Sequence, residues 1–200
     1  MTFIPRPTHD PEPGLRRRVR AYRGALPGVD LYCPADRFAR RGLPHWLGEE
    51  GLGISVRSGR ALTRALAAGF PPARILSHDG RPAERVGRVV LTRASDVLPA
   101  AVRVPRGARQ RVVLSVTALP GLRRLLSQPR LELAGLYCPG VPAARVVELL
   151  VRVHDENGVS VRELHLGDSL VTETLTVLTR LTAGRATHGL AVPRLALEPC

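Results

Sequence analysis

Short apolar runs alternate with amphipathic stretches along most of this chain, and glycine or proline separates many of them. The runs that predict β-strands are Val29–Cys33, Gly53–Val56, Arg74–Ser77, Arg88–Thr92, Arg111–Val116, Leu131–Cys138, Val161–Leu166 and Arg194–Glu198. The stretches that predict helices between them are Arg37–Glu50, Gly59–Ala68, Pro82–Val86, Val97–Ala101, Leu119–Ser127, Pro142–Asn157 and Leu170–Thr182. The pattern therefore predicts strands and helices in alternation.

A further amphipathic helix is predicted ahead of the first strand, over Leu15–Pro27. Its apolar side chains recur at helical spacing, and they are Leu15, Val19, Tyr22 and Leu26. Residues 1–14 are polar and rich in proline, so we expect a disordered segment followed by a single domain over residues 15–200. We expect structural roles for two histidines. His154 belongs to the turn that ends a helix before Gly158, and His165 lies in a strand and packs inside the barrel that the eight predicted strands would form.

Strands that alternate with helices favour parallel pairing through crossover connections. Eight such units predict a closed α/β barrel of the (β/α)8 TIM type. Because 200 residues is short for this architecture, a barrel whose unit near the fourth and fifth strands is weak or missing is one alternative. An open doubly wound sheet is the other.

The positive charge of the chain is carried by arginine alone. The sequence has 30 basic residues, none of them lysine, and a net charge of +13. The densest group lies on the leading helix and comprises Arg16, Arg17, Arg18, Arg20 and Arg23. Few aromatic residues are available to stack on bases, so we expect non-specific adhesion to polyanions and no specific nucleic-acid partner.

The same patterns predict a location. No apolar run reaches the roughly 18–20 residues that span a bilayer, and the N-terminal residues lack the pattern of a signal peptide. We therefore expect a cytoplasmic protein with no membrane partner. Three cysteines is an odd number, which argues against a disulfide framework.

Several segments resemble, in the same order, the barrel domain of the diaminopimelate decarboxylases, which are pyridoxal-phosphate enzymes with an alanine-racemase-like barrel. The longest segment is Leu31–Gly80, which contains the pattern S-G-x-x-L-x-x-A-L-x-A-G-F-P-x-x-R-I. The other segments are Leu15–Pro27, Leu131–Cys138, Arg152–Leu170 and Arg194–Pro199. The resemblance implies a cofactor-binding barrel, and we expect this chain to lack the C-terminal β-domain of the family.

In this family a lysine at the end of the first strand, in a motif like Y-A-x-K-A-F, forms an imine with the cofactor. The matching stretch runs from Tyr32 to Phe38, and counting back from Trp46 places Asp36 at the lysine position. A carboxylate cannot form an imine, and no other lysine is present to replace the missing one. The resemblance therefore implies that the chain shares its ancestry with these enzymes but lacks their imine chemistry.

The resemblance also implies losses at the other cofactor contacts. The family histidine that stacks on the pyridine ring is replaced by Pro139. The glycine loop that holds the phosphate reads Gly167, Asp168, Ser169, in which a carboxylate would repel the phosphate. Glu198 matches the carboxylate that pairs with the pyridine nitrogen, although the arginine that ends the family's E-P-G-R motif is absent.

The mouth of such a barrel, where the carboxyl ends of the strands meet, is where functional side chains collect. We expect it to hold Cys33, Asp36, His78, Asp79, Cys138, Asp168, Glu198 and Cys200. His78 matches a family histidine after the third strand. Cys33, Cys138 and His78 are the candidates for a metal site, because thiols and imidazoles bind zinc. None of their spacings is the short C-x-x-C kind, so we expect no metal; the alternative is that Cys33 and Cys138 are small buried hydrophobic residues.

We therefore expect a non-catalytic barrel related to the diaminopimelate and ornithine decarboxylases, with no bound cofactor. Its role would be to bind a partner, either as a homodimer or as a heterodimer with an active decarboxylase paralogue. One alternative is a residual decarboxylase, or a small-ligand or metal binder that uses the carboxylates and thiols of the mouth. The other is a decaying gene fragment.

Overall fold

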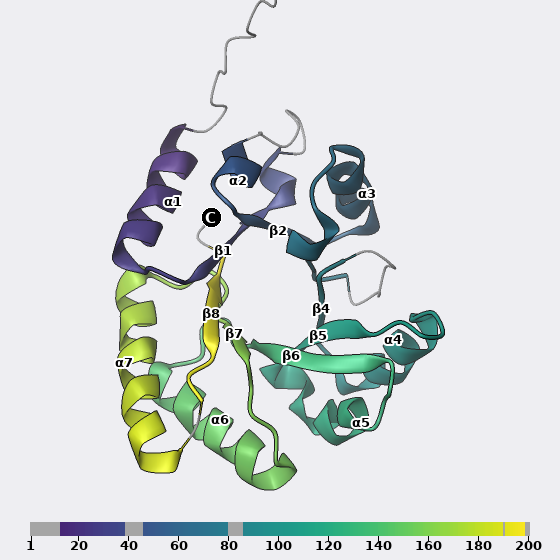
Figure 1. The fold of residues 1–200 in the computed structure, drawn as a ribbon, viewed down its shortest axis with the longest axis vertical. Helices are drawn as coiled ribbons and strands as arrows, with labels where there is room; N and C mark the ends of the chain where they lie inside the picture. Colours follow the sequence, from purple (N-terminus) through teal and green to yellow (C-terminus); the bar gives the residue numbers. More distant parts are fainter. Residues whose placement is uncertain (1–12, 39–45, 80–85, 190, 199–200) are drawn as a thin grey trace, which may run out of the picture.

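The computed structural model describes residues 13–38, 46–79, 86–189 and 191–198. Its strands form one closed, parallel barrel, in which β1 to β8 follow in chain order and β8 pairs with β1 (Figure 1). The strands are β1 Asp30–Pro34, β2 Gly53–Val56, β3 Ile75–Ser77, β4 Arg88–Leu91, β5 Gln110–Ser115, β6 Leu131–Tyr137, β7 Glu163–His165 and β8 Arg194–Leu197. The predicted (β/α)8 barrel is confirmed, and every predicted strand is present within about two residues.

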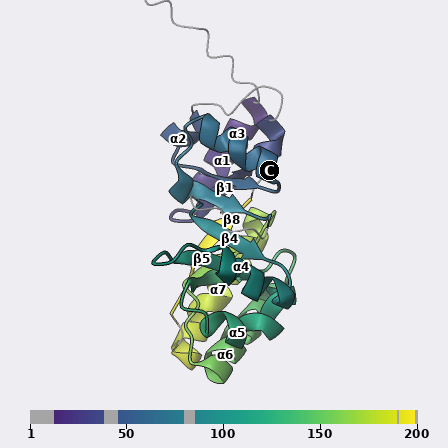
Figure 2. The ribbon, with the colours of Figure 1, turned by 90° about the vertical axis from the view of Figure 1, so that its right-hand side faces the viewer.

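Helices surround this barrel. They are α1 Pro13–Ala25, α2 Trp46–Glu49, α3 Gly59–Ala67, α4 Val97–Arg103, α5 Leu122–Leu126, α6 Ala143–Asn157 and α7 Val171–His188. Short 3-10 turns join several of them to the strands: η1 Ala35–Phe38, η2 Pro72–Arg74, η3 Ala94–Asp96 and η4 Val116–Gly121. Seen from the side, the strands lie between a group formed by α1, α2 and α3 and a group formed by α4 to α7 (Figure 2).

Local sequence signals explain where some of these helices begin and end. The Ser58 hydroxyl caps α3 by accepting a hydrogen bond from the Ala61 amide at 3.3 Å. Helix α6 ends at Gly158, whose φ of 65° is readily adopted only by glycine, and whose amide bonds to the His154 carbonyl at 2.7 Å. The interpretation of His154 as part of a helix-ending turn is confirmed.

Several predicted helices differ from those observed. The predicted helix over Arg37–Glu50 is divided between η1 and α2, and residues 39–45 between them lie outside the described residues. Most of the predicted Pro82–Val86 helix is also outside them, and Val86 itself is not helical. Helix α7 continues past the predicted end at Thr182 to His188, with Gly184 buried in the added part, and it ends before Gly189, whose φ is 66°.

The alternative of a weak unit near the fourth and fifth strands is wrong. Helix α4 connects β4 to β5, and β5 pairs with β6 along its whole length. The predicted disordered segment lies outside the described residues up to residue 12, whereas Pro13 and Gly14 already belong to α1. Proline is well tolerated at the first position of a helix, which accounts for the earlier start.

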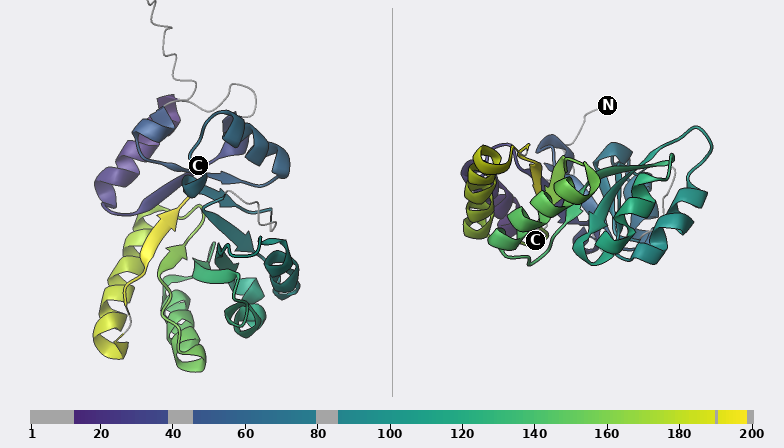
Figure 3. Two further views of the ribbon diagram at one scale, coloured as in Figure 1. Left: turned by 45° about the vertical axis from the view of Figure 1, so that its right-hand side comes forward. Right: turned by 90° about the horizontal axis from the view of Figure 1, so that it is seen from below.

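The core has two layers, because successive side chains of a strand point to opposite faces. The inner layer fills the barrel with Tyr32, Leu76, Val90, Val113 and Ala196, against which Tyr137 packs. The outer layer is larger and lies between the strands and the helices (Figure 3). A residue's place in this alternation therefore decides whether its side chain can reach the inside of the barrel.

Candidate functional site

The barrel mouth brings together side chains from four strands that are distant in sequence. Ser55 lies near the end of β2, His78 directly follows β3, Tyr137 ends β6 and Glu198 directly follows β8. Parallel pairing places all these carboxyl ends on one face of the barrel. With Arg57, which follows β2, these residues form what we call the mouth cluster.

Glu198 is the centre of the mouth cluster, and only 5% of it is exposed. One carboxylate oxygen, Oε2, accepts a hydrogen bond from the Ser55 hydroxyl at 2.8 Å. The other, Oε1, lies 3.1 Å from His78 Nε2, and an Arg57 nitrogen lies 4.0 Å from Oε2. Burial raises the pKa of Glu198, but the hydrogen bonds and charges of these three partners outweigh it and lower the pKa below its usual value. The carboxylate is therefore ionised and held in a fixed position.

His78 is in turn held from its other side. Its backbone amide bonds to the Val56 carbonyl at 2.8 Å, and its ring meets the edge of the Tyr137 ring at a centroid distance of 5.2 Å. Burial, followed by the charge of Glu198, raises the pKa of the Tyr137 phenol. The cluster thus brings together the side chains of a glutamate, a histidine, a serine and a tyrosine, with an arginine nearby.

The loop that follows β7 closes over one side of the mouth. Gly167 has a φ of 66°, and a side-chain carbon placed on it would lie 3.0 Å from the Cβ of Pro139. Its carbonyl accepts a hydrogen bond from the Glu198 amide at 2.7 Å, whereas the Asp168 side chain is exposed. The Ser169 hydroxyl bonds to the Leu166 carbonyl at 2.9 Å, so it points back into the loop rather than toward a ligand.

Asp36 lies apart from the mouth cluster. It belongs to η1, immediately beyond β1, and its side chain is exposed to solvent. Within the described ranges no hydrogen bond or ion pair joins it to His78 or Glu198. The residue at the predicted position of the imine-forming lysine is therefore a carboxylate that is exposed to solvent.

The prediction that Cys33 and Cys138 line the mouth is wrong, and the alternative that they are small buried hydrophobic residues is confirmed. Both side chains belong to the outer core layer and are at most 1% exposed, because they alternate with Tyr32 and Tyr137, which point inward. Burial raises the pKa of the Cys138 thiol to about 12, so it stays protonated and is a poor metal ligand. Among the residues that the structure describes, no three His, Cys, Asp or Glu side chains are placed to hold a metal ion. Cys200 lies outside the described residues.

A second polar group, which the sequence did not reveal, lies at the opposite end of the barrel. Glu163 is 7% exposed, and its carboxylate accepts hydrogen bonds of 2.5 and 2.8 Å from Arg88 and of 2.6 Å from Arg111. The buried His165 ring lies 3.4 Å from it and 5.8 Å, between centroids, from Tyr32. Burial raises the pKa of Glu163, but His165, Arg88 and Arg111 together lower it to about 2.

We call Arg88, Arg111, Glu163 and His165 the floor cluster, because Arg88, Arg111 and Glu163 lie at the amino ends of β4, β5 and β7. His165 is the last residue of β7, and its ring contacts the Glu163 carboxylate. The interpretation that His165 packs inside the barrel is confirmed, since it is 3% exposed. One signal could have identified the group. Arg88 and Arg111 begin apolar strands, and Glu163 occupies an inward position within another apolar run, where a lone charge requires a partner.

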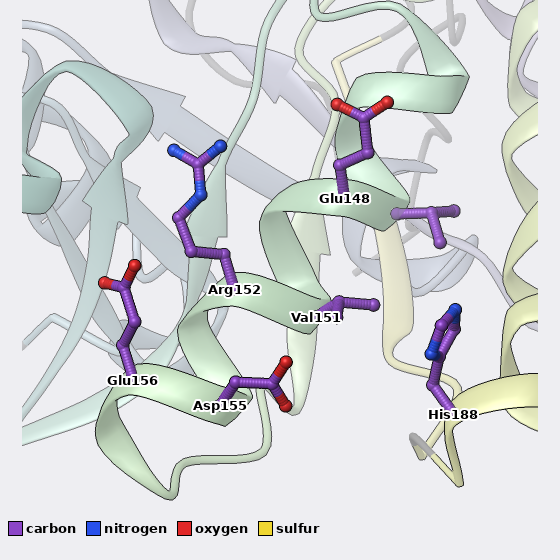
Figure 4. A pocket seen from close by; sticks show the side chains of 7 residues that line it. Glu148, Val151, Arg152, Asp155, Glu156 and His188 are labelled. Atoms are coloured by element: carbon purple, nitrogen blue, oxygen red, sulfur yellow. The ribbon is translucent and has the colours of Figure 1, made fainter.

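A groove of about 430 Å³ lies outside the barrel, between α6 and the end of α7. Figure 4 shows Glu148, Arg152, Asp155 and Glu156 along α6, with His188 on the facing helix. The groove belongs to the helical layer and shares no residue with either polar cluster. The mouth cluster is therefore the better candidate for a site inherited with the barrel.

Comparison with known proteins agrees with this architecture, although no family model matches the chain. It is 27% identical to a diaminopimelate decarboxylase of Corynebacterium efficiens, over 94% of the chain and 55% of that protein. It is 26% identical to a diaminopimelate decarboxylase of Actinosynnema pretiosum subsp. auranticum, over 92% of the chain and 55% of that protein. The chain is a homologue of the diaminopimelate decarboxylases. It spans about half the length of these relatives.

Solved structures of such decarboxylases share the fold. A diaminopimelate decarboxylase from M. jannaschii superposes with a TM-score of 0.73 at 12% identity, covering 92% of this chain and 58% of that one. A lysine decarboxylase from Selenomonas ruminantium gives 0.69 at 15% identity, with the same coverage. A lysine decarboxylase variant solved in complex with pyridoxal phosphate gives 0.64 at 13% identity, over 92% of this chain and 59% of that one. A barrel of this fold thus holds pyridoxal phosphate in that lysine decarboxylase.

The side chains of this chain do not fit that cofactor. The sequence supplies no lysine amine for an imine, and Asp36 at the expected position is a solvated carboxylate. Pro139 packs against Gly167 in place of a stacking ring, and Asp168 places a negative charge in the loop that would face a phosphate. Glu198 and His78 are the groups that match, but they contact each other, and both oxygens of Glu198 are already bonded within the protein.

Over the described ranges, no helix is both long enough and apolar enough to cross a bilayer.

Proposed function

We propose that this chain is a non-catalytic member of the decarboxylase group, a barrel that acts by binding rather than by imine chemistry. The observation that carries the proposal is the absence of lysine from all 200 residues. An imine-dependent decarboxylase needs a side-chain amine as its nucleophile, and arginine cannot replace it because its guanidinium stays protonated. The solvated Asp36 and the loop around Asp168 support the same conclusion.

The partner that suits this proposal is another decarboxylase-type barrel, either a second copy of the chain or an active paralogue. Support comes from the fold, which is retained in full around a well-packed core even though the cofactor contacts are lost. A barrel without selection for folding would accumulate unpaired buried charges, whereas Glu163 and Glu198 are each bonded to several partners. The retained fold therefore argues against a decaying gene fragment.

The absence of imine chemistry can be tested by absorbance and mass spectrometry. The purified protein is incubated with pyridoxal phosphate, reduced with borohydride and digested, so that any imine becomes a stable, mappable adduct. We expect modification at the N-terminal amine alone and no imine band that hydroxylamine removes from the folded barrel. An adduct on a barrel residue, or turnover of diaminopimelate, would overturn the proposal.

Two matched variants make the test sharper. Asp36→Lys places a single amine at the predicted position, and Arg17→Lys places one on the exposed face of α1. If Asp36 occupies the ancestral lysine position, Asp36→Lys gives a stronger imine signal than Arg17→Lys at the same cofactor concentration. Equal signals would show that the position is assigned wrongly, while the wild-type result still stands.

Partner binding is tested separately by native mass spectrometry. The protein is measured alone and after co-expression with an intact diaminopimelate decarboxylase from a related organism. We expect a dimer in one of the two samples. A monomer in both would contradict the partner role without affecting the conclusion on imine chemistry.

A further inference from the structure

The segment from Arg93 to Arg130 contains an unusual concentration of unbalanced charge. It holds eight arginines and one acidic residue, Asp96, and therefore contributes 8 − 1 = +7 of the net charge of +13. The arginines are Arg93, Arg103, Arg106, Arg109, Arg111, Arg123, Arg124 and Arg130. The segment includes α4 and α5, which lie side by side at one edge of the molecule (Figures 1 and 3).

Four of these arginines have no neutralising partner in the described part of the chain. Arg103, Arg106, Arg123 and Arg124 are exposed, and none of their guanidinium groups makes a hydrogen bond or ion pair with a described residue. On α1, by contrast, Arg20 and Arg23 bond to Glu50. A guanidinium prefers a carboxylate or phosphate partner in a forked geometry, so four free ones on α4, on α5 and in the turn after α4 form a surface that attracts anions.

Exposed aliphatic side chains lie among these arginines. Helix α4 buries Val97, Ala100 and Ala101 against the barrel, which turns Leu98 and Val102 outward, one helical turn apart. Leu98 is 46% exposed, Val102 77%, and Leu126 at the end of α5 is 40% exposed. These are three of the six large apolar residues that the described structure exposes to this degree. The surface therefore offers apolar contact together with positive charge.

We propose that this surface, formed by Leu98, Val102, Arg103, Arg106, Arg123 and Arg124, binds the face of an anionic lipid bilayer. Basic side chains approach the phosphate layer, while the aliphatic side chains between them enter the boundary of the acyl chains. Nucleic acid matches less well, because residues 93–130 contain no aromatic side chain to stack on bases and the aliphatic groups would gain nothing there. The sequence-based expectation of no membrane partner rested on the lack of a spanning run, which peripheral binding does not require.

The proposal is tested by sedimentation with vesicles of phosphatidylcholine alone or mixed with phosphatidylglycerol. We expect binding to the mixed vesicles only, and a decrease as the salt concentration rises. Each arginine near an anionic bilayer contributes roughly a fivefold factor, so Arg103→Gln, Arg106→Gln, Arg123→Gln and Arg124→Gln together should lower the partition coefficient by roughly several hundredfold. Melting curves confirm that the variants are folded.

A matched variant separates this surface from net charge. Arg17→Gln, Arg18→Gln, Arg180→Gln and Arg185→Gln remove the same charge from exposed positions on α1 and α7, and should change partitioning by less than about fivefold. Leu98→Ser with Val102→Ser should weaken vesicle binding and leave the binding of a mixed-sequence DNA duplex unchanged. Equal losses for the two arginine sets, no binding to mixed vesicles, or vesicle binding that is insensitive to the serine variants would each overturn the proposal.

Discussion

Each end of the barrel holds a buried glutamate, but the groups that compensate its negative charge differ between the two ends. At the floor, Glu163 is bonded to two arginines, at 2.5 to 2.8 Å, and approached by a neutral histidine. At the mouth, Glu198 has a hydroxyl and an imidazole at hydrogen-bond distance, and its one arginine is 4.0 Å away and 62% exposed at the side chain. The charge of Glu163 is thus fully compensated, in a way that suits a structural role. The mouth keeps polar groups that could exchange partners, as expected of a former site.

The largest effect is expected from Glu163→Gln, which would leave Arg88 buried without an anionic partner. Removing one member of a buried ion pair costs about 3–5 kcal/mol. Urea unfolding at neutral pH measures this free energy. The control is Glu132→Gln, whose pair with Arg162 is exposed and 3.5 Å long, and it should cost less than about 1 kcal/mol.

If Glu163→Gln is too unstable to study, the double variant Glu163→Gln with Arg111→Gln provides a second test of the same ion pair. Removing the partly exposed arginine as well should recover part of the lost stability, because fewer positive charges then remain unpaired. Equal costs for the glutamine substitutions at Glu163 and Glu132 would contradict a difference between the buried pair and the surface pair.

Acid should also lower the free energy of unfolding mainly through the floor cluster. The pKa of Glu163 is about 2 in the folded protein against 4.5 for the free side chain, so its stabilisation is present above pH 4.5 and is lost as pH falls toward 2. Its full value is about 3 kcal/mol. Burial lowers the pKa of His165, which adds a loss that begins as pH falls below 6.5. Urea unfolding across this range should show the loss in the wild type and a flatter acid limb in Glu163→Gln.

Smaller effects are expected at the mouth. Ser55→Ala removes one hydrogen bond to the Glu198 carboxylate and should cost about 1–3 kcal/mol, because that acceptor is buried and charged. Arg57→Gln should cost less than about 0.5 kcal/mol, since its side chain is exposed and its contact with Glu198 is long. Thermal unfolding would rank the two, and a larger loss for Arg57→Gln would contradict the view that the hydroxyl holds the carboxylate.

Much of the fold could be predicted because each strand is an apolar run bounded by glycine, proline or polar residues, and this signal is local. The charged residues of the floor cluster carry a sequence signal, but their pairing could not be predicted, because Arg88 and Glu163 are 75 residues apart and only barrel closure places them in contact. Cys33 was misplaced for a related reason. A shift of one position reverses the face of a strand, and the sequence alone did not fix that register. Glu198 and His78 were predicted at the mouth, whereas Ser55 was missed inside a buried run.

The seam between β8 and β1 has a consequence for how the chain folds. At the floor, the seam is closed by an ion pair between Arg194 and Asp30, which are 2.6 Å apart in space and 164 residues apart in sequence. At the mouth, a hydrogen bond beside the seam joins Ser55 to Glu198, which are 143 residues apart in sequence. Neither contact can form before nearly the whole chain is available, and contacts of such high sequence separation slow folding. We therefore expect the barrel to close late and cooperatively during synthesis, with the last strand acting as its closing step.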